Sequence, residues 1–323
     1  MDIKGLFTDT HFGVKNNSMT WLKSQLDFIY KQFIPELREL KKTHPGKQII
    51  LIHLGDVFDS RSTISTMVAT EVRKAFGALR EVVDEFNIIA GNHDYYSPTS
   101  DEVNSINLLL SGLNINLFTK TKIYYNGDLY MPWYTYGDDI EVRDGVKRIF
   151  THADIVSTPP KYKGIPIYSG HMHIPHIEGD VRNLGSCYAL NFADANHHRG
   201  YYVLNGDDLE FVPNMASIRF WRLYNDDILE NLIWPMIKDG DYIELYISKE
   251  NLSKQNYIEK INSLTTIYKN LWVIPQINHT SNLEEVDISN WDMEKIAWSM
   301  VDDDLKEKFQ EVLNRVNGSV IIE

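Results

Sequence analysis

The sequence lacks features that several classes of protein need. Cys187 is the only cysteine among 323 residues, so disulfide bonds within the chain and cysteine-based zinc sites are excluded, and a reducing cytoplasm is expected. No run approaches the roughly 20 apolar residues of a membrane-spanning helix. Residues 1–4 lead directly into a strand-like stretch, so we expect no secretory signal.

Basic residues are in the minority. The chain has 32 Lys and Arg against 45 Asp and Glu, which gives a formal net charge of −13. A protein that binds DNA irrespective of sequence usually presents a basic surface, so this balance argues against a large, exposed nucleic-acid groove. DNA binding through bound metal ions, local basic clusters or a basic partner remains open.

Continuous apolar runs alternate with helical periodicities in the first part of the chain, and a β-rich part follows. Apolar residues at three- and four-residue spacing predict helices, whereas continuous apolar runs indicate strands buried on both faces. The expected helices cover residues 19–42, 68–79 and 103–111. The expected strands cover residues 5–8, 48–54, 86–90, 123–125, 129–131, 148–151, 165–169, 201–204 and 209–212. This order predicts an α/β fold with two packed sheets and helices outside.

The pattern changes after Pro213. A strand at 241–248, a helix at 254–268 and a strand at 271–277 predict a small α/β unit. The last stretch is acidic and helical in pattern, and the apolar stripe that begins at Trp291 indicates either a partner-docking face or a local core. We therefore expect three parts, at residues 1–213, 214–280 and 281–323.

Five clusters of Asp, Asn and His follow the apolar runs. They are Asp9–His11, Gly55–Asp59, Gly91–Asp94, Thr151–His152 and Gly170–His173. Because ligands bind at the carboxyl ends of strands in α/β sheets, we expect these clusters to converge. Their carboxylate, amide and imidazole groups favour Mn²⁺, Zn²⁺ or Fe over a pure Mg²⁺ or Ca²⁺ site.

The clusters supply enough groups for two metal ions. Two metals that share one carboxylate need about seven protein groups, and such a pair clamps a phosphate for in-line attack. Turn capping by short polar side chains is the alternative for each residue alone, but the ordered recurrence favours a metal site. The candidate ligands are Asp9, His11, Asp56, Asn92, His152, His171 and His173.

The motifs D-x-H, G-D-x-x-D, G-N-H-D, a lone histidine and G-H-x-H occur in this order over residues 1–175. This pattern resembles the calcineurin-like metallophosphoesterase superfamily. The resemblance implies a four-layer α/β/β/α sandwich and two metal sites that share Asp56. It also implies that His93 stabilises the transition state or protonates the leaving oxygen, oriented by Asp59. The implied ligands are Asp9, His11, Asp56 and His173 for the first metal, and Asp56, Asn92, His152 and His171 for the second.

Three further features resemble the SbcD-type nuclease, a subunit that repairs DNA double-strand breaks, in the compact version of T4-like phages. They are the stretch GDVFDSR at 55–61 before a long helix, the pair NLGS at 183–186 and RGYY at 199–202, and the C-terminal layout. The resemblance implies a Mn²⁺-dependent DNA exonuclease or endonuclease that works with an SMC-like, SbcC-type ATPase. It also implies a homodimer paired through about 64–83, a DNA-facing capping unit at 214–280 and an ATPase-docking segment at 281–323.

Several departures leave other functions open. The chain is short for a cellular SbcD subunit, His152 lacks the glycine that often follows it, and some relatives carry histidine where this chain has Asp59. A stand-alone metallophosphatase or small-molecule phosphodiesterase would suit the acidic charge, but the long C-terminal extension weighs against it. An inactive scaffold for the ATPase is a third candidate, but it would not need a complete set of ligands.

Other polar residues have plainer interpretations. His53 lies inside an apolar strand and is interpreted as a hydrogen-bonded core histidine. Asp94 is expected to bond turn amides, and Cys187 to serve packing. His197 and His198 either face phosphate or belong to a solvated loop, and the loop is the preferred interpretation.

Overall fold

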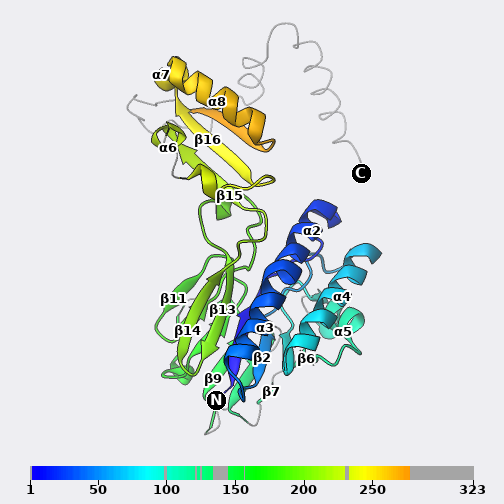
Figure 1. Cartoon of the computed structure of the whole chain (residues 1–323). Coiled ribbons are helices and arrows are strands. Elements are labelled where there is room, and N and C mark those ends of the chain that lie inside the picture. The colour runs from blue at the N-terminus through cyan, green and yellow to red at the C-terminus, as the bar shows by residue number, and fades with distance from the viewer. Residues whose placement is uncertain are drawn as a thin grey trace, which may run out of the picture. The chain divides into compact units, whose positions relative to one another are not determined.

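The computed structural model describes residues 2–97, 100–120, 122–123, 126–133, 145–155, 157–229 and 233–276. Residues Met1–Gln276 form one compact unit, shown in Figure 1. The helices expected beyond residue 280 and the segment 281–323 lie outside the described residues. Within the described part of the chain, none of the helices has the length and apolar character needed to span a membrane.

The first six-stranded sheet has the order β14-β13-β1-β2-β3-β6. Its central strands β1, β2 and β3 are parallel neighbours, and every residue of β1 and β2 is buried. The apolar runs predicted these strands because a strand covered on both faces has no polar side. The bounds are β1 Ile3–Phe7, β2 Ile49–His53, β3 Glu85–Ile89, β6 Asn116–Phe118, β13 Gly200–Asn205 and β14 Asp208–Pro213.

The second six-stranded sheet has the order β11-β12-β10-β9-β8-β7. Its strands β8, β9, β10 and β12 are parallel, while β7 and β11 pair antiparallel at the edges. The expected hairpin is confirmed, with Gly127 at φ 86° in its turn. The bounds are β7 Lys122–Ile123, β8 Asp128–Met131, β9 Arg148–Thr151, β10 Ile167–Ser169, β11 His176–Glu178 and β12 Val181–Asn183.

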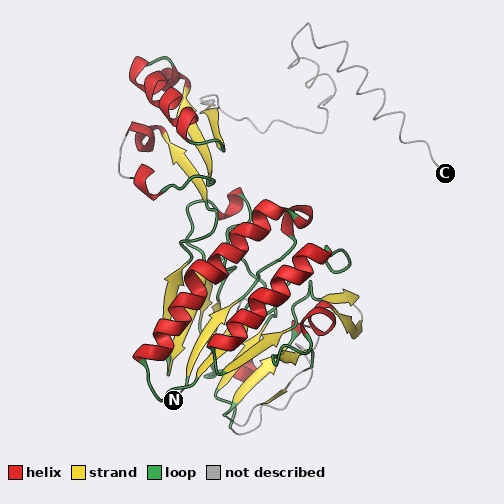
Figure 2. Ribbon diagram, turned by 45° about the vertical axis from the view of Figure 1, so that its right-hand side comes forward, coloured by secondary structure: helices red, strands yellow, loops and turns green. Residues whose placement is uncertain are grey.

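The helices of the first part cover one face of the first sheet (Figure 2). The helix expected at 19–42 is confirmed as one continuous helix. It consists of α2 Met19–Phe28, the π-helical turn η1 Ile29–Phe33 and α3 Ile34–Thr43. The π-helical turn η1 stands just before Pro35, which removes a backbone donor from the helix. The expected helix at 103–111 is shorter, because residues 100–104 pair as a strand and Asn104 then caps the helix. The remaining bounds are α1 Val14–Asn17, α4 Thr66–Val82, α5 Ser105–Leu110, β4 Tyr95–Ser97 and β5 Ser100–Asn104.

Separate apolar clusters hold the layers together. Phe7, Phe76 and Phe86 pack between the first sheet and the helices, and a stack that includes Tyr130 and Phe150 fills the space between the two sheets. The outer face of the second sheet is covered, within the described residues, by the short 3₁₀ helix η3 Pro160–Tyr162 and its loop. The expected α/β sandwich is confirmed, with a thin fourth layer on that side.

A small sheet of three parallel strands follows, in the order β15-β16-β17. Helix α8 covers one face, where Leu223, Leu245 and Leu264 form a local core. The apolar pattern predicted β16, α8 and β17 but not β15. Trp21 of α2 stacks on Phe220 of this sheet at 5.8 Å. The bounds are β15 Phe220–Tyr224, α6 Asn225–Leu229, η5 Trp234–Met236, β16 Tyr242–Ser248, α7 Lys249–Leu252, α8 Gln255–Ile267 and β17 Leu271–Gln276.

Candidate metal centre

The five polar clusters lie where β1, β2, β3, β9 and β10 end. Four of the candidate ligands take the left-handed backbone conformation, which is uncommon for residues other than glycine. The φ angles are 52° at Asp9, 40° at His11, 55° at Asp56 and 75° at His171. Such conformations cost free energy and cluster at functional sites. They turn the chain sharply so that side chains from both sheets reach one place.

Asp9, His11 and His173 form the first group that can hold a metal ion, with one ligand atom of each within 4.8 Å of the others. The Nε2 atoms of His11 and His173 are 3.1 Å apart. The Oδ1 atom of Asp9 lies 3.7 Å from Nε2 of each histidine. The D-x-H and G-H-x-H motifs therefore meet across the two sheets.

Asp56, His152 and His171 form the second group, within the same limit of 4.8 Å. The amide oxygen of Asn92 joins them, because Oδ1 lies 3.1 Å from His152 Nε2 and 3.0 Å from His171 Nδ1. A side chain with one carbonyl oxygen near two imidazole nitrogens suits a shared cation.

Asp56 lies between the two groups. Its Oδ2 atom is 3.2 Å from His152 Nε2 in one group and 3.8 Å from His11 Nε2 in the other. All seven candidate ligands are thus gathered in one site, with Asp56 at the point that both groups share.

One buried atom shows that this site fits a cation. Asp9 Oδ2 accepts hydrogen bonds from the Thr8 hydroxyl and the His171 backbone N–H. Asp9 Oδ1 is buried and, within the described part of the chain, has no hydrogen-bond partner. A buried carboxylate oxygen without a partner is costly, and a divalent cation would supply the missing interaction.

The charges of the site also favour a bound cation. Burial opposes a proton on His11, but the nearby carboxylates of Asp59, Asp9 and Asp56 outweigh it and raise the pKa of His11 to about 10. Burial likewise opposes a proton on His152, but the charge of Asp56 raises its pKa to about 9. The carboxylates of Asp9, Asp56 and Asp59 therefore create a negative potential strong enough to hold protons on these two buried histidines, and a cation would occupy the same potential.

The surrounding backbone fixes how the ligands point. The Nδ1–H of His152 donates to the Leu54 carbonyl at 2.6 Å, which leaves Nε2 free to face the site. Gly91 and Gly170 are needed because a Cβ atom at either position would overlap neighbouring site atoms, those of Asp56 beside Gly91 and those of Thr8 and His152 beside Gly170. These glycines allow the close backbone approach that their motifs predicted.

His93 lies beside both groups. Its backbone N–H donates to Asp56 Oδ1 at 2.8 Å, and its ring Nδ1–H donates to the backbone carbonyl of Asp59 at 2.6 Å. The carboxylate of Asp59 instead faces His11, with Oδ1 3.5 Å from Nδ1. The expected orientation of His93 by Asp59 therefore comes from the main chain of Asp59 and not from its side chain.

Gln25 and Trp133 belong to the site but were not predicted from the sequence. The buried amide of Gln25 donates to the Thr10 carbonyl at 2.6 Å and holds the loop of Asp9 and His11. A glutamine on the apolar stripe of a helix was the available signal. The ring of Trp133 lies 4.8 Å from that of His171. Trp133 follows the end of β8, as the polar clusters follow other strands.

Arg199 holds the second sheet's ligand loop in place. The buried Arg199 donates to the carboxylate of Asp194 and to the backbone carbonyl of His173. The N–H of Ser186 donates to the same carbonyl at 3.1 Å. The two stretches at 183–186 and 199–202 therefore both donate a hydrogen bond to the backbone carbonyl of His173.

The plainer interpretations of His53 and Asp94 are confirmed. His53 is buried, accepts from the Gly55 N–H at 3.1 Å and lies 3.0 Å from the Thr10 hydroxyl. Asp94 accepts from the N–H groups of Gly91 and Val57 at 2.9 and 3.1 Å. Burial raises the pKa of Asp94 to about 6. Both residues support the turns that carry the ligands.

Comparison with known proteins agrees with this geometry. The profile of the family "Calcineurin-like phosphoesterase" matches residues 5–266. The chain is also 26% identical over 234 residues to "Exonuclease subunit 1" of Enterobacteria phage T4, and the alignment covers 65% of this chain and 67% of that protein. The superfamily expected from the motifs is confirmed: the chain belongs to the calcineurin-like phosphoesterase family and is a metal-dependent phosphoesterase.

Proposed function

We propose that the chain is the nuclease subunit of a DNA recombination and repair complex. It hydrolyses DNA phosphodiesters at a pair of divalent metal ions, and Mn²⁺ is the expected metal. The observation that carries the proposal is the meeting of the two ligand groups at Asp56, beside the unpartnered Oδ1 of Asp9. The name of the phage T4 relative, an exonuclease subunit, supports the choice of substrate.

The ligands divide between the two ions as their distances suggest. Asp9, His11 and His173 would hold one ion, and Asn92, His152 and His171 the other, while Asp56 would contact both. Two bound cations would supply the Lewis acidity that activates water and neutralises the charge of the phosphate.

His93 is proposed to handle the proton of the leaving group. With Nδ1–H donated to the Asp59 carbonyl, a protonated ring presents Nε2–H to the departing 3′-oxygen, and the neutral ring keeps the same orientation. The hydrogen bond between the His93 N–H and Asp56 Oδ1 fixes the distance of this ring from the ligands. His93 therefore acts as general acid or as a stabiliser of the transition state.

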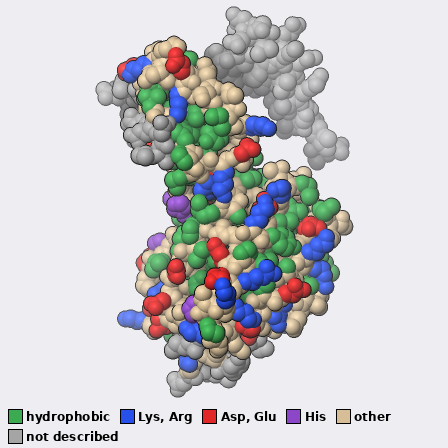
Figure 3. All heavy atoms as spheres, in the orientation of Figure 1, with side chains coloured by type: hydrophobic (Ala, Val, Ile, Leu, Met, Phe, Trp, Pro, Cys, Tyr) green, Lys and Arg blue, Asp and Glu red, His purple; other side chains and the backbone are tan. Residues whose placement is uncertain are grey.

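The remaining parts of the chain are proposed to serve partners. Residues 1–213 carry the chemistry, 214–280 form a DNA-facing capping unit and 281–323 dock an SMC-like, SbcC-type ATPase. Two subunits would pair through α4, whose Met67 is 50% exposed. On the face drawn in Figure 3, basic and acidic side chains are interspersed. With a net charge of −13, the chain would rely on a basic partner for much of its DNA surface, in the cytoplasm.

The test is degradation of end-labelled DNA by metal-free protein to which Mn²⁺ is restored. We expect cleavage with Mn²⁺, none with chelator, and a rate lowered about 10²- to 10⁴-fold in His93→Gln, the range of general acid catalysis. His44→Gln, in a histidine distant in the fold, serves as the matched control. DNA left intact with Mn²⁺ would contradict the nuclease assignment, and wild-type activity in His93→Gln would contradict the role of His93.

A stand-alone phosphatase or small-molecule phosphodiesterase is the second candidate, favoured by the acidic charge. It differs from the nuclease in the ratio of kcat/KM for single-stranded DNA to that for bis-p-nitrophenyl phosphate, measured on the full chain. A nuclease favours DNA, whereas a small-molecule enzyme favours the aryl ester. An inactive scaffold would hydrolyse neither and would bind no metal.

A further inference from the structure

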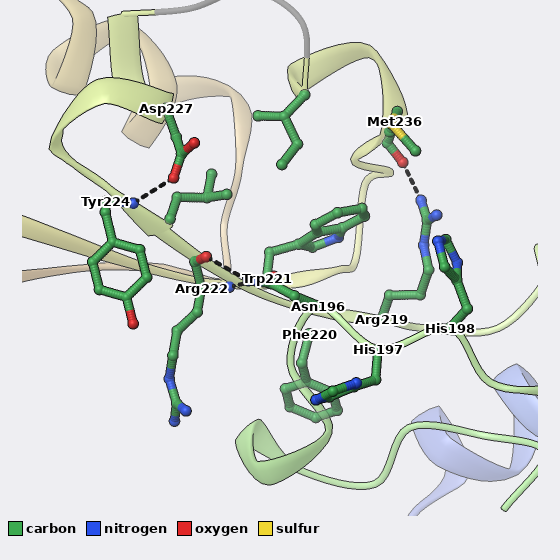
Figure 4. Close-up of a pocket in the computed structure, with 12 residues that line it drawn as sticks. Asn196, His197, His198, Arg219, Phe220, Trp221, Arg222, Tyr224, Asp227 and Met236 are labelled. Carbon is green, nitrogen blue, oxygen red and sulfur yellow. Dashed lines mark hydrogen bonds between the residues drawn. The ribbon is translucent and has the colours of Figure 1, made fainter. Parts of the chain in front are cut away.

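A cavity lies along β15, the edge strand of the small sheet (Figure 4). Its volume is about 320 Å³, at the lower end of the range of small-molecule sites. Tyr224 and Arg222 border it from one face of β15, while Trp221 borders it from the other face. The loop of His197 and His198, which leads into β13, also lines the cavity. The cavity shares no residue with the metal centre.

The lining of this cavity favours an anion. Among the described residues, Arg219, Arg222, His197 and His198 line it together with one acidic residue, Asp227. Arg219 pairs with Asp241 at 3.3 Å and Arg222 with Glu244 at 2.8 Å. The carboxylate of Asp227 already accepts the N–H of Tyr224 at 2.8 Å. The Nε and Nη1 atoms of Arg219 are buried and have no hydrogen-bond partner within the described residues. With the two imidazole rings, they provide N–H groups that can donate to a phosphate oxygen.

The same cavity has an aromatic wall that is held in place. Tyr224 is 47% exposed and stacks on Tyr246, with the ring centroids 5.4 Å apart. The Tyr246 hydroxyl donates to Glu244 at 3.1 Å, and Arg222 donates to the same carboxylate oxygen at 2.8 Å. A fixed, exposed ring beside a guanidinium group suits the stacking of an unpaired base, which any base can make.

A short, ordered loop joins this cavity to the metal centre. The side chain of Asn196 pairs with the edge of β15, since it donates to the Arg222 carbonyl at 2.8 Å and accepts from the Arg222 N–H at 3.0 Å. Three residues further on, Arg199 donates to the carbonyl of His173. Three residues span at most about 11 Å. The segment from Asn196 to Arg199 therefore contacts both β15, which lines the cavity, and the loop that carries His173.

We propose that this cavity holds an unpaired nucleotide of a DNA strand whose scissile phosphate lies in the metal centre. The base stacks on Tyr224, and the phosphate lies among His197, His198 and Arg219. This inference rests on the proposed nuclease function and adds to it a site for single-stranded DNA. Base pairs inside a duplex are stacked on both faces and cannot stack on Tyr224, so the site favours unpaired strands over the interior of a duplex.

The test measures binding without catalysis, by the fluorescence anisotropy of a labelled oligothymidine with the full chain in EDTA. We expect Tyr224→Ala to raise the Kd about 5- to 100-fold, the range of one lost base stack. Tyr224→Phe keeps the ring and is expected to bind as the wild type does. His197→Gln combined with His198→Gln is expected to weaken binding, because two possible donors to the phosphate are changed. Tyr96→Ala, in another exposed tyrosine, is the matched control.

Each outcome decides one question. Unchanged affinity in folded Tyr224→Ala, checked by circular dichroism, would overturn the inference, as would equal losses for the oligothymidine and for a blunt duplex. The proposed function is tested separately by Mn²⁺-dependent hydrolysis of bis-p-nitrophenyl phosphate in the wild type. If that hydrolysis fails while the oligothymidine still binds through Tyr224, the nuclease proposal fails and the binding site stands.

Discussion

The ring of His93 hydrogen-bonds the backbone carbonyl of Asp59, and the carboxylate of Asp59 faces His11 instead. The two side chains of the expected catalytic pair therefore have different tasks. His93 is oriented by the main chain and is free to act on the substrate. The carboxylate of Asp59 would act through His11, a candidate metal ligand, by holding the orientation of its ring.

This separation predicts different kinetic effects. His93→Gln lowers kcat about 10²- to 10⁴-fold at saturating Mn²⁺ and leaves the Mn²⁺ affinity unchanged. Asp59→Asn weakens Mn²⁺ binding about 10- to 100-fold, because the support of His11 is lost, and leaves most of kcat at saturating metal. Titration of phosphodiester hydrolysis with Mn²⁺ separates the two. Equal losses of kcat in both variants would show that the Asp59 side chain works with His93.

Gly91 is predicted to tolerate no side chain. Gly91→Ala places a Cβ atom against the carboxylate and N–H of Asp56, so metal binding and hydrolysis should fall by at least about 100-fold. Gly77→Ala in α4 is the matched control, since a Cβ atom added there lies in ordinary contact, 3.9 Å from Cδ2 of Leu113. Removing a glycine from a helix should there raise the stability by about 0.5–1 kcal/mol. Activity assays and urea unfolding are carried out on both variants. A Gly91→Ala variant with wild-type activity would contradict the close approach of Gly91 to Asp56.

The buried pair of Arg199 and Asp194 is predicted to be important for stability. Both side chains are buried, 3% and 5% exposed, so Arg199→Gln leaves a carboxylate without its charged partner. The expected loss is about 3–5 kcal/mol in the free energy of unfolding. Urea unfolding of Arg199→Gln, Asp194→Asn and the double variant gives the coupling between them. Additive losses would mean that the two groups do not interact.

His53 predicts a dependence of stability on pH. Burial lowers the pKa of His53 from 6.5 to about 3, so below about pH 6.5 the unfolded chain binds a proton that the folded chain excludes. The contribution of His53 to stability therefore falls as the pH is lowered from 6.5 toward 3, opposite in sign to the contributions of His11 and His152, whose pKa values are raised. The contribution at pH 5.5 is about 1.4 kcal/mol of lost stability relative to pH 7.5.

Urea unfolding at these two pH values checks the prediction. Relative to the wild type, His53→Gln should gain about 1.4 kcal/mol in the change of unfolding free energy from pH 7.5 to pH 5.5, because the contribution of His53 is removed. His176→Gln, in an exposed histidine, should show the same change as the wild type. An equal change in wild type and His53→Gln would show that the ring takes up a proton in the folded state.

The sequence predicted the parts of the fold that have a simple pattern. The buried strands β1, β2 and β3 are continuous apolar runs, and the continuous helix of α2, η1 and α3 has a regular apolar stripe. β15 was missed because its sequence, FWRLY, mixes buried Trp221 with half-buried Arg222 on opposite faces of a sheet edge. The predicted helix at 103–111 was longer than α5 because Val103 continues the helical periodicity. In the structure, Val103 belongs to β5, which pairs with β4.

The candidate ligands were predictable because their motifs follow strand ends, where topology brings them together. The supporting contacts were not predictable in the same way. Gln25 and Arg199 act on backbone carbonyls far from them in sequence, and such contacts leave no spacing pattern. The role of Asp59 depends on whether its carboxylate or its backbone carbonyl accepts the hydrogen bond from His93. The residue types alone do not distinguish these two arrangements, whereas the three-dimensional structure does.

The number of metal ions bound per chain is the decisive measurement for a two-metal site that shares Asp56. Metal-free protein is dialysed against saturating Mn²⁺ and analysed by atomic emission, for the wild type and for Asp56→Asn. We expect two ions per wild-type chain and fewer in Asp56→Asn, because Asp56 lies between both groups. A wild-type chain that binds fewer than two ions at saturation, or an Asp56→Asn variant that keeps both with unchanged affinity, would contradict it.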